Sequence, residues 1–344
     1  MRRFLLFSVI MTSALTARPK ALFYLTDSPA SVRSFLAHAS KVDILVPTWY
    51  SVDAAGLVSG GPNPLVMETA KAHHVPVMPI IVNPGFNQDN FHKLLGNPDG
   101  KRHMIDALVS ECKKHGYLGF QYDFENILWT DGGALTQLVS ETAVRLHREG
   151  LQLSIATVPN APGFPGKGAF ARWIFANWRG AYDLKALAES VDLICLMTYD
   201  EHTRYTPPGP VAGYPWTLEN LEYALKVVPK EKLSLGIPLY GYRWFAGDPG
   251  KEEKPSIAAA SIGGEDVRQL IDTFHPQMEW DAGDKTAWFY FYRDAMREWV
   301  FYTDKRAFEE RLKLVTDRGI QGFCSWVLGQ EDPAIWDALA AESH

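Results

Sequence analysis

Cysteine is scarce in this sequence, with three copies among 344 residues: Cys112, Cys195 and Cys324. No two of them form a C-x-x-C pair, so neither a disulfide-stapled scaffold nor a zinc site of cysteines is indicated. Cys112 falls in a helical pattern, and the other two fall in apolar, strand-like runs. We therefore expect three free, mostly buried thiols and no metal site or cofactor, although the sequence leaves open one bridge between two of them.

The chain also lacks an excess of positive charge. Its 34 lysines and arginines stand against 40 aspartates and glutamates, which gives a net charge of −6. Proteins that bind nucleic acid usually carry a basic surface, so this composition argues against a nucleic-acid partner. Internal repeats, low-complexity tracts and linkers are lacking as well, and we expect one folded unit over residues 18–344 that exists as a monomer.

Long apolar runs are confined to the N-terminus. Arg2 and Arg3 are followed by a mainly apolar stretch at residues 4–17, which is too short to span a bilayer comfortably. This order is typical of a signal peptide, which we place at residues 1–17, with cleavage after Ala14 or Ala17. It predicts a protein exported to the envelope, the periplasm or the medium, without stable membrane insertion. An ordinary buried helix is the alternative.

Apolar, β-branched runs alternate with helical patterns along the rest of the chain, which predicts parallel strands joined by helices. Eight such units favour a closed (β/α)8 TIM barrel of the α/β class. An open doubly wound sheet is the alternative, but its usual glycine-rich turn after the first strand is missing. The predicted strands are residues 21–27, 42–52, 75–83, 117–126, 151–159, 191–200, 232–244 and 320–328. The predicted helices are residues 101–115, 134–149, 184–190, 218–228, 307–318 and 333–341.

One segment interrupts this rhythm after the seventh predicted strand. Residues 245–304 contain a helical pattern at 265–274 and strand-like runs at 286–292 and 297–302. We interpret the segment as a small α+β insertion within the barrel that forms one wall of a cleft.

Polar side chains alternate with aromatic ones on the fourth predicted strand. Successive side chains of a strand point to opposite faces, so Gln121, Asp123 and Glu125 share one face. In a barrel, the aromatic face packs beneath the outer helices and the polar face points inward. Buried charges need partners, yet no lysine or arginine lies on this strand, which favours a functional role over a structural one.

The two carboxylates of this strand are neighbours, with Cα atoms about 7 Å apart. Neighbouring carboxylates repel when both are ionised, so one stays protonated, and a protonated Glu125 is what a general acid requires. Side by side, Asp123 and Glu125 cannot easily flank a glycosidic bond as the carboxylates of conventional glycosidases do. Attack by the carbonyl oxygen of an N-acetyl group in the substrate would remove that requirement.

The segment resembles the D-x-x-D-x-D-x-E strand of glycoside hydrolase family 18, the chitinase-like family. It keeps the last Asp as Asp123 and the Glu as Glu125, and it departs from the pattern at Leu118 and Gln121. The resemblance implies that Glu125 is the general acid/base and that Asp123 orients it. We expect Gln121 to hydrogen-bond Asp123 without sharing a proton with it, which affects the pH optimum and the rate more than the reaction type.

Further segments resemble other strands of that family: LMTYD at 196–200, GIPLYG at 236–241 and GFCSW at 322–326. The first implies that Tyr199 holds the N-acetyl group and that Asp200 contacts the same sugar. The last implies that Trp326 stacks beneath that sugar. Trp49, at the end of the second predicted strand, is expected to line the cleft because barrel enzymes place their sites at that end. The expected substrate-binding residues are Gln121, Asp200, Trp326, Tyr240, Met197 and Trp49.

The segments EH at 201–202, GPVA at 209–212 and YGYRW at 240–244 resemble the branch of bacterial spore-germination-type and chitinase-domain hydrolases. The implied function is retaining, substrate-assisted cleavage of β-1,4 linkages in N-acetylglucosamine-containing oligo- or polysaccharides of the chitin or peptidoglycan type. Two alternatives stay open. One is a non-catalytic chitooligosaccharide-binding lectin on the same barrel, and the other is a conventional glycosidase with Glu125 and Asp200 as its pair.

Overall fold

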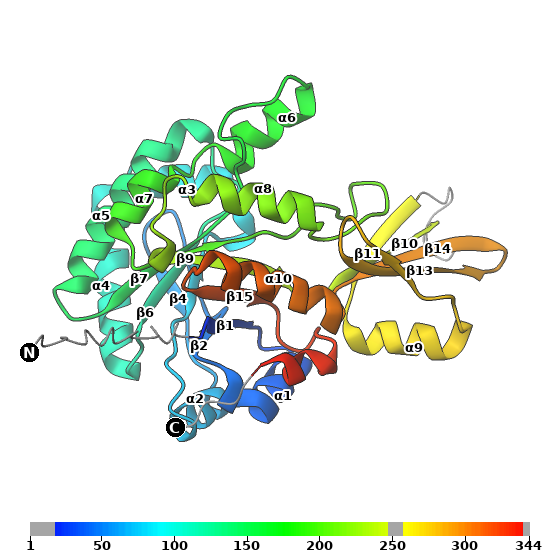
Figure 1. The fold of residues 1–344 in the computed structure, drawn as a ribbon. Helices are drawn as coiled ribbons and strands as arrows, with labels where there is room; N and C mark the ends of the chain where they lie inside the picture. The colour runs from blue at the N-terminus through cyan, green and yellow to red at the C-terminus, as the bar shows by residue number, and fades with distance from the viewer. Residues whose placement is uncertain (1–17, 247–256, 340–344) are drawn as a thin grey trace, which may run out of the picture.

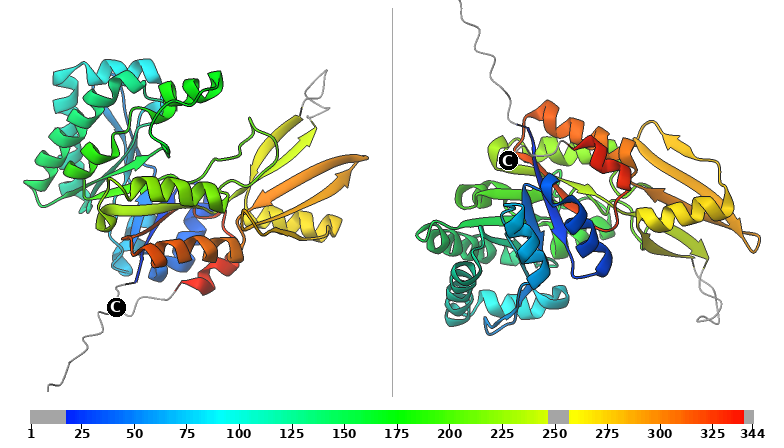
Figure 2. Two further views of the ribbon diagram at one scale, coloured as in Figure 1. Left: turned by 45° about the horizontal axis from the view of Figure 1, so that its top comes forward. Right: turned by 90° about the horizontal axis from the view of Figure 1, so that it is seen from below.

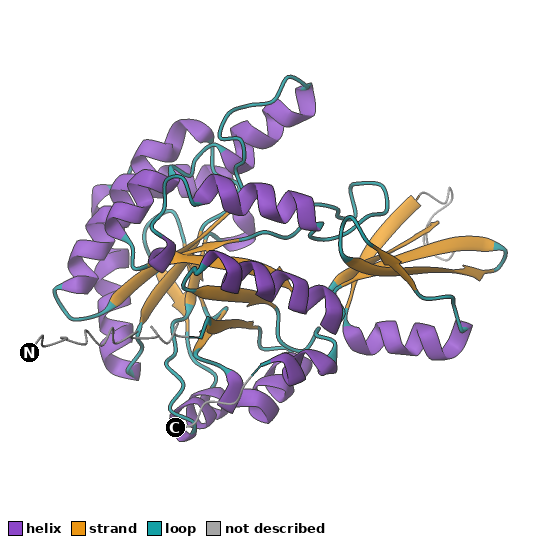
Figure 3. Cartoon of the chain, viewed as in Figure 1, coloured by secondary structure: helices purple, strands orange, loops and turns teal. Residues whose placement is uncertain are grey.

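The computed structural model describes residues 18–246 and 257–339, and the predicted signal peptide at 1–17 lies outside them. Figure 1 shows strands enclosed by helices, with a second, smaller sheet projecting from one side. The helices and strands coloured in Figure 3 alternate around the ring as the sequence predicts. The fold is an α/β TIM barrel with a small α+β insertion after its seventh strand, which confirms the predicted fold class.

Parallel pairing joins the strands of the barrel in one continuous sheet. Its ends meet where Leu45 bridges Val77 in parallel, immediately before the third barrel strand. The barrel strands are β1 (Lys20–Leu25), β2 (Ile44–Pro47), β5 (Ile80–Val82), β6 (Gly119–Asp123), β7 (Gln152–Thr157), β8 (Leu193–Leu196), β9 (Leu233–Pro238) and β15 (Gly322–Trp326).

The strand predicted at 42–52 is divided into two pieces. The chain turns after β2, where the Trp49 N–H donates to the Pro47 carbonyl at 3.1 Å. It then continues as β3 (Tyr50–Val52), which pairs in parallel with β5 and forms a hairpin with β4 (Val58–Gly60). Pro47, the last residue of β2, marks this break, because a proline interrupts strand pairing, and the prediction of one strand overlooked it.

Helices cover the outside of the barrel (Figure 2). Several helices have a Ser or Asn N-cap followed by a proline in the first turn. The N-cap residues are Ser28, Asn63 and Asn97, and their side chains accept hydrogen bonds from free N–H groups of the first turn. The helices around the barrel are α1 (Pro29–His38), α2 (Pro64–Ala72), α3 (Gln88–Leu95), α4 (Pro98–His115), α5 (Gly132–His147), α6 (Ala169–Ile174), α7 (Leu184–Ser190), α8 (Tyr214–Ala224) and α10 (Lys305–Arg318). The predicted final helix is a 3₁₀ helix at Pro333–Ala338. No helix in the described parts of the chain is both long and apolar enough to cross a membrane.

The strands separate two apolar cores. Phe120, Tyr122 and Phe124 belong to the larger core between the sheet and the helices, as the alternation on this strand predicts. The smaller core fills the interior of the barrel and includes Cys195 and Cys324. All three cysteines are free and buried, as expected. Polar side chains of β6 that point inward therefore meet a nearly closed apolar interior.

The insertion is an antiparallel sheet with one helix packed on it. Its strands are β10 (Gly241–Ala246), β11 (Ile257–Ile262), β12 (Glu279–Asp281), β13 (Thr286–Arg293) and β14 (Met296–Tyr302), and its helix is α9 (Gly264–Phe274). The sheet order is β11-β10-β14-β13-β12. The predicted helix and two strand-like runs match α9, β13 and β14. The run predicted as one strand at 232–244 is divided between barrel strand β9 and insertion strand β10.

A buried arginine on α10 joins the insertion to the barrel. The Arg311 guanidinium donates to the carbonyl oxygens of Ala212, Asp284 and Lys285, which come from the barrel loop before α8 and from the base of the insertion. The side chain is 2% exposed, and burial lowers its pKa to about 10. The Asp284 carbonyl also accepts from the Tyr214 N–H, so the guanidinium matters most to the carbonyls of Ala212 and Lys285, for which loss of a donor is costly.

Replacing this arginine should destabilise the protein. In Arg311→Leu several carbonyl oxygens lose their donor while the apolar stem is kept, and we expect the free energy of unfolding to fall by about 3 kcal/mol. Urea unfolding followed by circular dichroism measures this loss. The control is Arg318→Leu, which removes a half-exposed arginine whose partner is Glu222, and an exposed pair contributes about 1 kcal/mol at most. Equal urea midpoints for both variants would contradict the assigned role.

Candidate active site

The two carboxylates predicted from the sequence lie at the carboxyl end of β6. Asp123 is the last residue of the strand and is 6% exposed, while Glu125 follows two residues later and is half-buried. Asn83, at the end of β5, fixes the backbone there: its amide oxygen accepts from the Glu125 N–H at 3.1 Å, and its amide nitrogen donates to the Glu125 carbonyl at 2.9 Å. The Tyr182 hydroxyl donates to the Phe124 carbonyl at 2.6 Å. Hydrogen bonds to the peptide groups of Phe124 and Glu125 therefore fix the backbone of Glu125, the general-acid candidate.

Burial controls the ionisation of these carboxylates. It raises the pKa of Asp123 from 3.8 to about 7. Burial also raises the pKa of Glu125 well above its ordinary value, and the charges of Asp123 and Asp200 add to the effect. A protonated Glu125 at neutral pH is thus favoured both by desolvation and by its acidic neighbours.

The opposite part of the site is built after β8. Burial raises the pKa of Tyr199 well above 10, with smaller contributions from Cys324, Asp123 and other neighbours, so its hydroxyl stays a hydrogen-bond donor. Asp200 is exposed, has a left-handed backbone with φ of 62°, and accepts a 2.5 Å hydrogen bond from the Tyr240 hydroxyl. A non-glycine residue in this region is uncommon and is often found at functional sites.

An aromatic side chain lies at the carboxyl end of β15. Trp326 ends β15 and is half-exposed, with its ring 5.3 Å from that of Tyr24, which is buried in the barrel. Both pack on the interior core together with Tyr199 and Met197, and Met197 is 7% exposed. The structure thus brings Trp326, Tyr199 and Met197 together on one apolar surface.

Gln121 does not make the predicted contact with Asp123. Its amide nitrogen donates instead to Ser154 Oγ at 2.8 Å and to Cys195 Sγ at 3.1 Å. Among the described residues, neither the Gln121 amide oxygen nor Asp123 Oδ1 has a hydrogen-bond partner. The prediction was wrong because side chains on neighbouring strands β7 and β8 lie within reach of the amide, and a single strand does not reveal them. Gln121 is fully buried beneath the site rather than exposed to a ligand.

Trp49 packs in the outer core rather than on the interior core that Met197, Tyr199 and Trp326 contact. It is 5% exposed in the outer core, its ring is 6.3 Å from that of Tyr117, and its indole N–H donates to Asp27 at 3.3 Å. The polar positioning residues Asn83 and Tyr182 were not among the principal predicted residues. The sequence indicated Asn83 only through its place at the end of a predicted strand. It gave no indication of Tyr182, because the Tyr182 hydroxyl binds a backbone carbonyl and residue order does not reveal such a contact.

No group of three or more histidine, cysteine or acidic side chains in the described ranges is arranged to hold a metal ion. The groups that lie here suit acid–base chemistry: the Glu125 carboxyl with its raised pKa, the buried Asp123 carboxyl beside it, the Tyr199 hydroxyl as a hydrogen-bond donor and the ring of Trp326.

Comparison with known proteins identifies the group of enzymes that share this architecture. The family model of glycosyl hydrolases family 18 matches residues 23–331. The chain belongs to glycosyl hydrolase family 18. This confirms the resemblance and identifies the protein as a chitinase-like glycoside hydrolase.

Relatives within family 18 are distant in sequence and similar in structure. The glycosylase YvbX of Bacillus subtilis is 23% identical over 92% of this chain and 89% of its own length. The cortical fragment-lytic enzyme of B. subtilis is 27% identical over 75% of this chain, which spans only 57% of that protein. The crystal structure of a Chromobacterium violaceum chitinase superposes with a TM-score of 0.81 at 25% identity, covering 93% of this chain and 97% of that one.

The raised pKa of Asp123 predicts how stability depends on pH. Between pH 4 and pH 7 the folded protein keeps a proton that the unfolded chain releases, so unfolding becomes easier as the pH rises. The largest loss is about 4 kcal/mol over this range. Asp123→Asn should flatten the slope in urea unfolding measured at several pH values, whereas Asp99→Asn, on the exposed start of α4, should not. Equal slopes in the wild type and Asp123→Asn would refute the assignment.

Proposed function

We propose that this family 18 enzyme cleaves β-1,4 linkages of N-acetylglucosamine-containing glycans with retention of configuration, using the substrate's own N-acetyl group as nucleophile. The observation that carries the proposal is the pair of carboxyl groups at the end of β6, where burial and the neighbouring charges of Asp123 and Asp200 raise the pKa of Glu125. Glu125 gives its proton to the leaving oxygen and later takes one from water.

The remaining side chains suit the other half of the reaction. Tyr199 donates its hydroxyl hydrogen to the N-acetyl carbonyl and holds that oxygen below the anomeric carbon. Asp123 lies next to Glu125. Once Asp123 is ionised, its negative charge stabilises the positive charge of the cyclised intermediate. A carboxyl that titrates near pH 7 can change its charge during turnover at small cost.

The position of Asp200 supports substrate assistance over a conventional carboxylate pair. One of its oxygens is engaged by the Tyr240 hydroxyl at 2.5 Å, which suits a residue that holds a sugar hydroxyl rather than one that attacks carbon. Trp326 offers its ring face to the same sugar.

The names of the relatives guide the choice of glycan and compartment. They include cortical fragment-lytic enzymes of Bacillus species and a class V chitinase of Arabidopsis thaliana. We accordingly place the substrate among chitin- or peptidoglycan-type glycans, and we propose that the enzyme acts outside the cytoplasm as a monomer.

Changing Glu125 to Gln should abolish turnover and leave binding largely intact. The amide keeps the size of the side chain but cannot donate the proton, and loss of a general acid costs about 10² to 10⁴ in rate. Release of a fluorophore from a chitooligosaccharide glycoside measures turnover, and calorimetry with the free oligosaccharide measures binding. Glu222→Gln, at the partner of Arg318, serves as the control. Undiminished turnover in Glu125→Gln would end the proposal.

A thiazoline mimic of the cyclised intermediate separates the two mechanisms. Substrate assistance predicts competitive inhibition at least about 100-fold tighter than binding of the parent sugar, because the mimic resembles the transition state. Tyr199→Phe should weaken binding of the mimic more than it weakens binding of the substrate. Weak inhibition together with loss of activity in Asp200→Asn would instead favour Glu125 and Asp200 as a conventional pair.

A further inference from the structure

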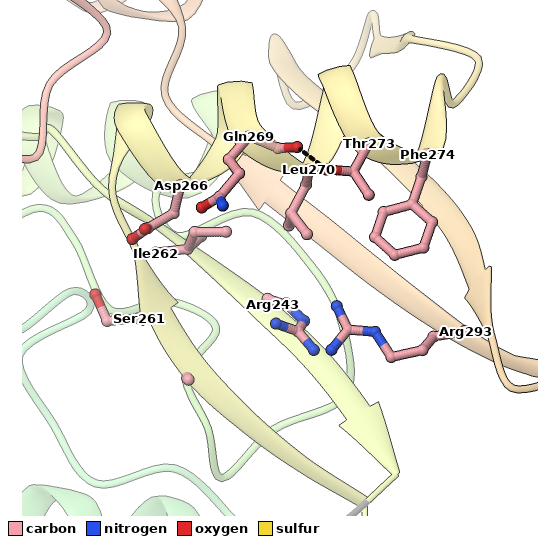
Figure 4. Close-up of a pocket in the computed structure, with 10 residues that line it drawn as sticks. Arg243, Ser261, Ile262, Asp266, Gln269, Leu270, Thr273, Phe274 and Arg293 are labelled. Carbon is pink, nitrogen blue, oxygen red and sulfur yellow. Dashed lines mark hydrogen bonds between the residues drawn. The ribbon is translucent and has the colours of Figure 1, made fainter.

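A cavity of about 390 Å³ lies between the insertion sheet and α9 (Figure 4). Its volume falls within the range of about 300–1,000 Å³ that is usual for small-molecule sites. Arg243 of β10 and Arg293 of β13 line it from the sheet, and its apolar wall consists of Ile262, Leu270 and Phe274. The cavity is thus large enough for an organic molecule rather than a bare ion.

Two guanidinium groups lie next to each other in this cavity, as Figure 4 shows. Arg243 Nε donates to Glu298 Oε2 at 2.6 Å, and Arg293 Nε lies 3.6 Å from Glu298 Oε1. Glu298 is buried beneath them, with 5% of its surface exposed. One carboxylate therefore balances two positive charges, which leaves this cluster of three side chains with one positive charge in excess.

The outer ends of the two guanidinium groups are not used by the protein. Within the described ranges, no terminal nitrogen of Arg243 or Arg293 donates a hydrogen bond to another residue. Asp266 also lines the cavity, but it forms no ion pair with either arginine there. Adjacent like charges repel each other, and a bound anion would remove that repulsion and accept the free hydrogen bonds.

Aromatic rings hold both guanidinium groups in place. The Arg243 guanidinium lies 5.1 Å from the ring centroid of Phe245 and 6.0 Å from that of Phe291. The Arg293 guanidinium lies 5.5 Å from the ring centroid of Phe274 and 5.8 Å from that of Phe291. Both charges thus share the buried ring of Phe291, and these cation–π contacts fix the donors before a ligand arrives, which reduces the entropic cost of binding.

We propose that this cavity is a second, non-catalytic site that binds a small organic carboxylate. A carboxylate accepts parallel hydrogen bonds from a guanidinium group, and its single negative charge equals the excess charge of the arginine cluster. The apolar wall suits a hydrocarbon part attached to that carboxylate, which inorganic phosphate lacks, and a neutral sugar would leave the charge unmatched. The inference goes beyond the proposed function, because none of the active-site residues lines the cavity.

Calorimetry of the purified enzyme with hexanoate and with its neutral analogue hexanamide tests the site. We expect saturable binding of hexanoate and no binding of hexanamide. Arg293→Met removes one guanidinium and keeps the pair of Arg243 with Glu298, so it should weaken hexanoate binding about tenfold. The control Arg297→Met removes the same charge from an exposed arginine of the same hairpin, which hydrogen-bonds Tyr292, and it should bind hexanoate as the wild type does. Turnover of a fluorogenic chitobioside should stay unchanged in both variants.

Several outcomes would overturn the carboxylate site. They are a wild type that does not bind hexanoate, equal binding of hexanamide, an equal loss in Arg293→Met and Arg297→Met, or tighter binding of inorganic phosphate than of hexanoate. If Arg293→Met unfolds at a lower temperature, Thr273→Phe decides by the same measurements. That change fills part of the cavity from α9 and keeps both arginines, and it should also abolish hexanoate binding.

The source of the carboxylate is identified by sedimentation with two polymers. Peptidoglycan carries carboxylate groups and chitin does not, so the Glu125→Gln enzyme is compared on both with and without Arg293→Met. Weaker retention on peptidoglycan alone assigns the site to a carboxylate that the glycan carries, whereas unchanged retention on both polymers assigns it to a free carboxylate. An equal loss on chitin and peptidoglycan would contradict recognition of a carboxylate.

Discussion

Burial of carboxyl groups at the carboxyl end of β6 is the constraint on which the active site depends. Removing Asp123 from water raises its pKa to about 7, and the same effect together with neighbouring acidic groups raises that of Glu125. Such burial opposes folding whenever the groups are ionised, so it persists only where the surrounding structure is rigid. Most of the local architecture can be understood as the support for this unfavourable arrangement.

That support comes mainly from backbone contacts. Asn83 and Tyr182 hold the peptide groups on either side of Phe124, and neither needs to touch the carboxyl groups. The closed barrel supplies rigid strand ends, while the apolar interior beneath them excludes the water that would return Asp123 to its ordinary pKa. Reactivity and stability therefore oppose each other at this strand, as they do at many active sites.

The insertion is held against the barrel by one buried side chain. Arg311 fixes its base to the barrel through buried carbonyl oxygens, so the sheet keeps a defined position beside the mouth. One face of that sheet completes its own small core with α9.

The sequence by itself determined the barrel, the insertion and the acidic pair, because periodicity of two along β6 and alternation of strands with helices are local properties written in residue order. It could not show that Gln121 donates to Ser154 and Cys195, or that Trp49 is packed in the outer core, since these contacts join separate strands. Tertiary structure also decided the roles of Asn83 and the pKa of Asp123. Both depend on burial and on neighbours distant in the chain, which only closure of the barrel brings together.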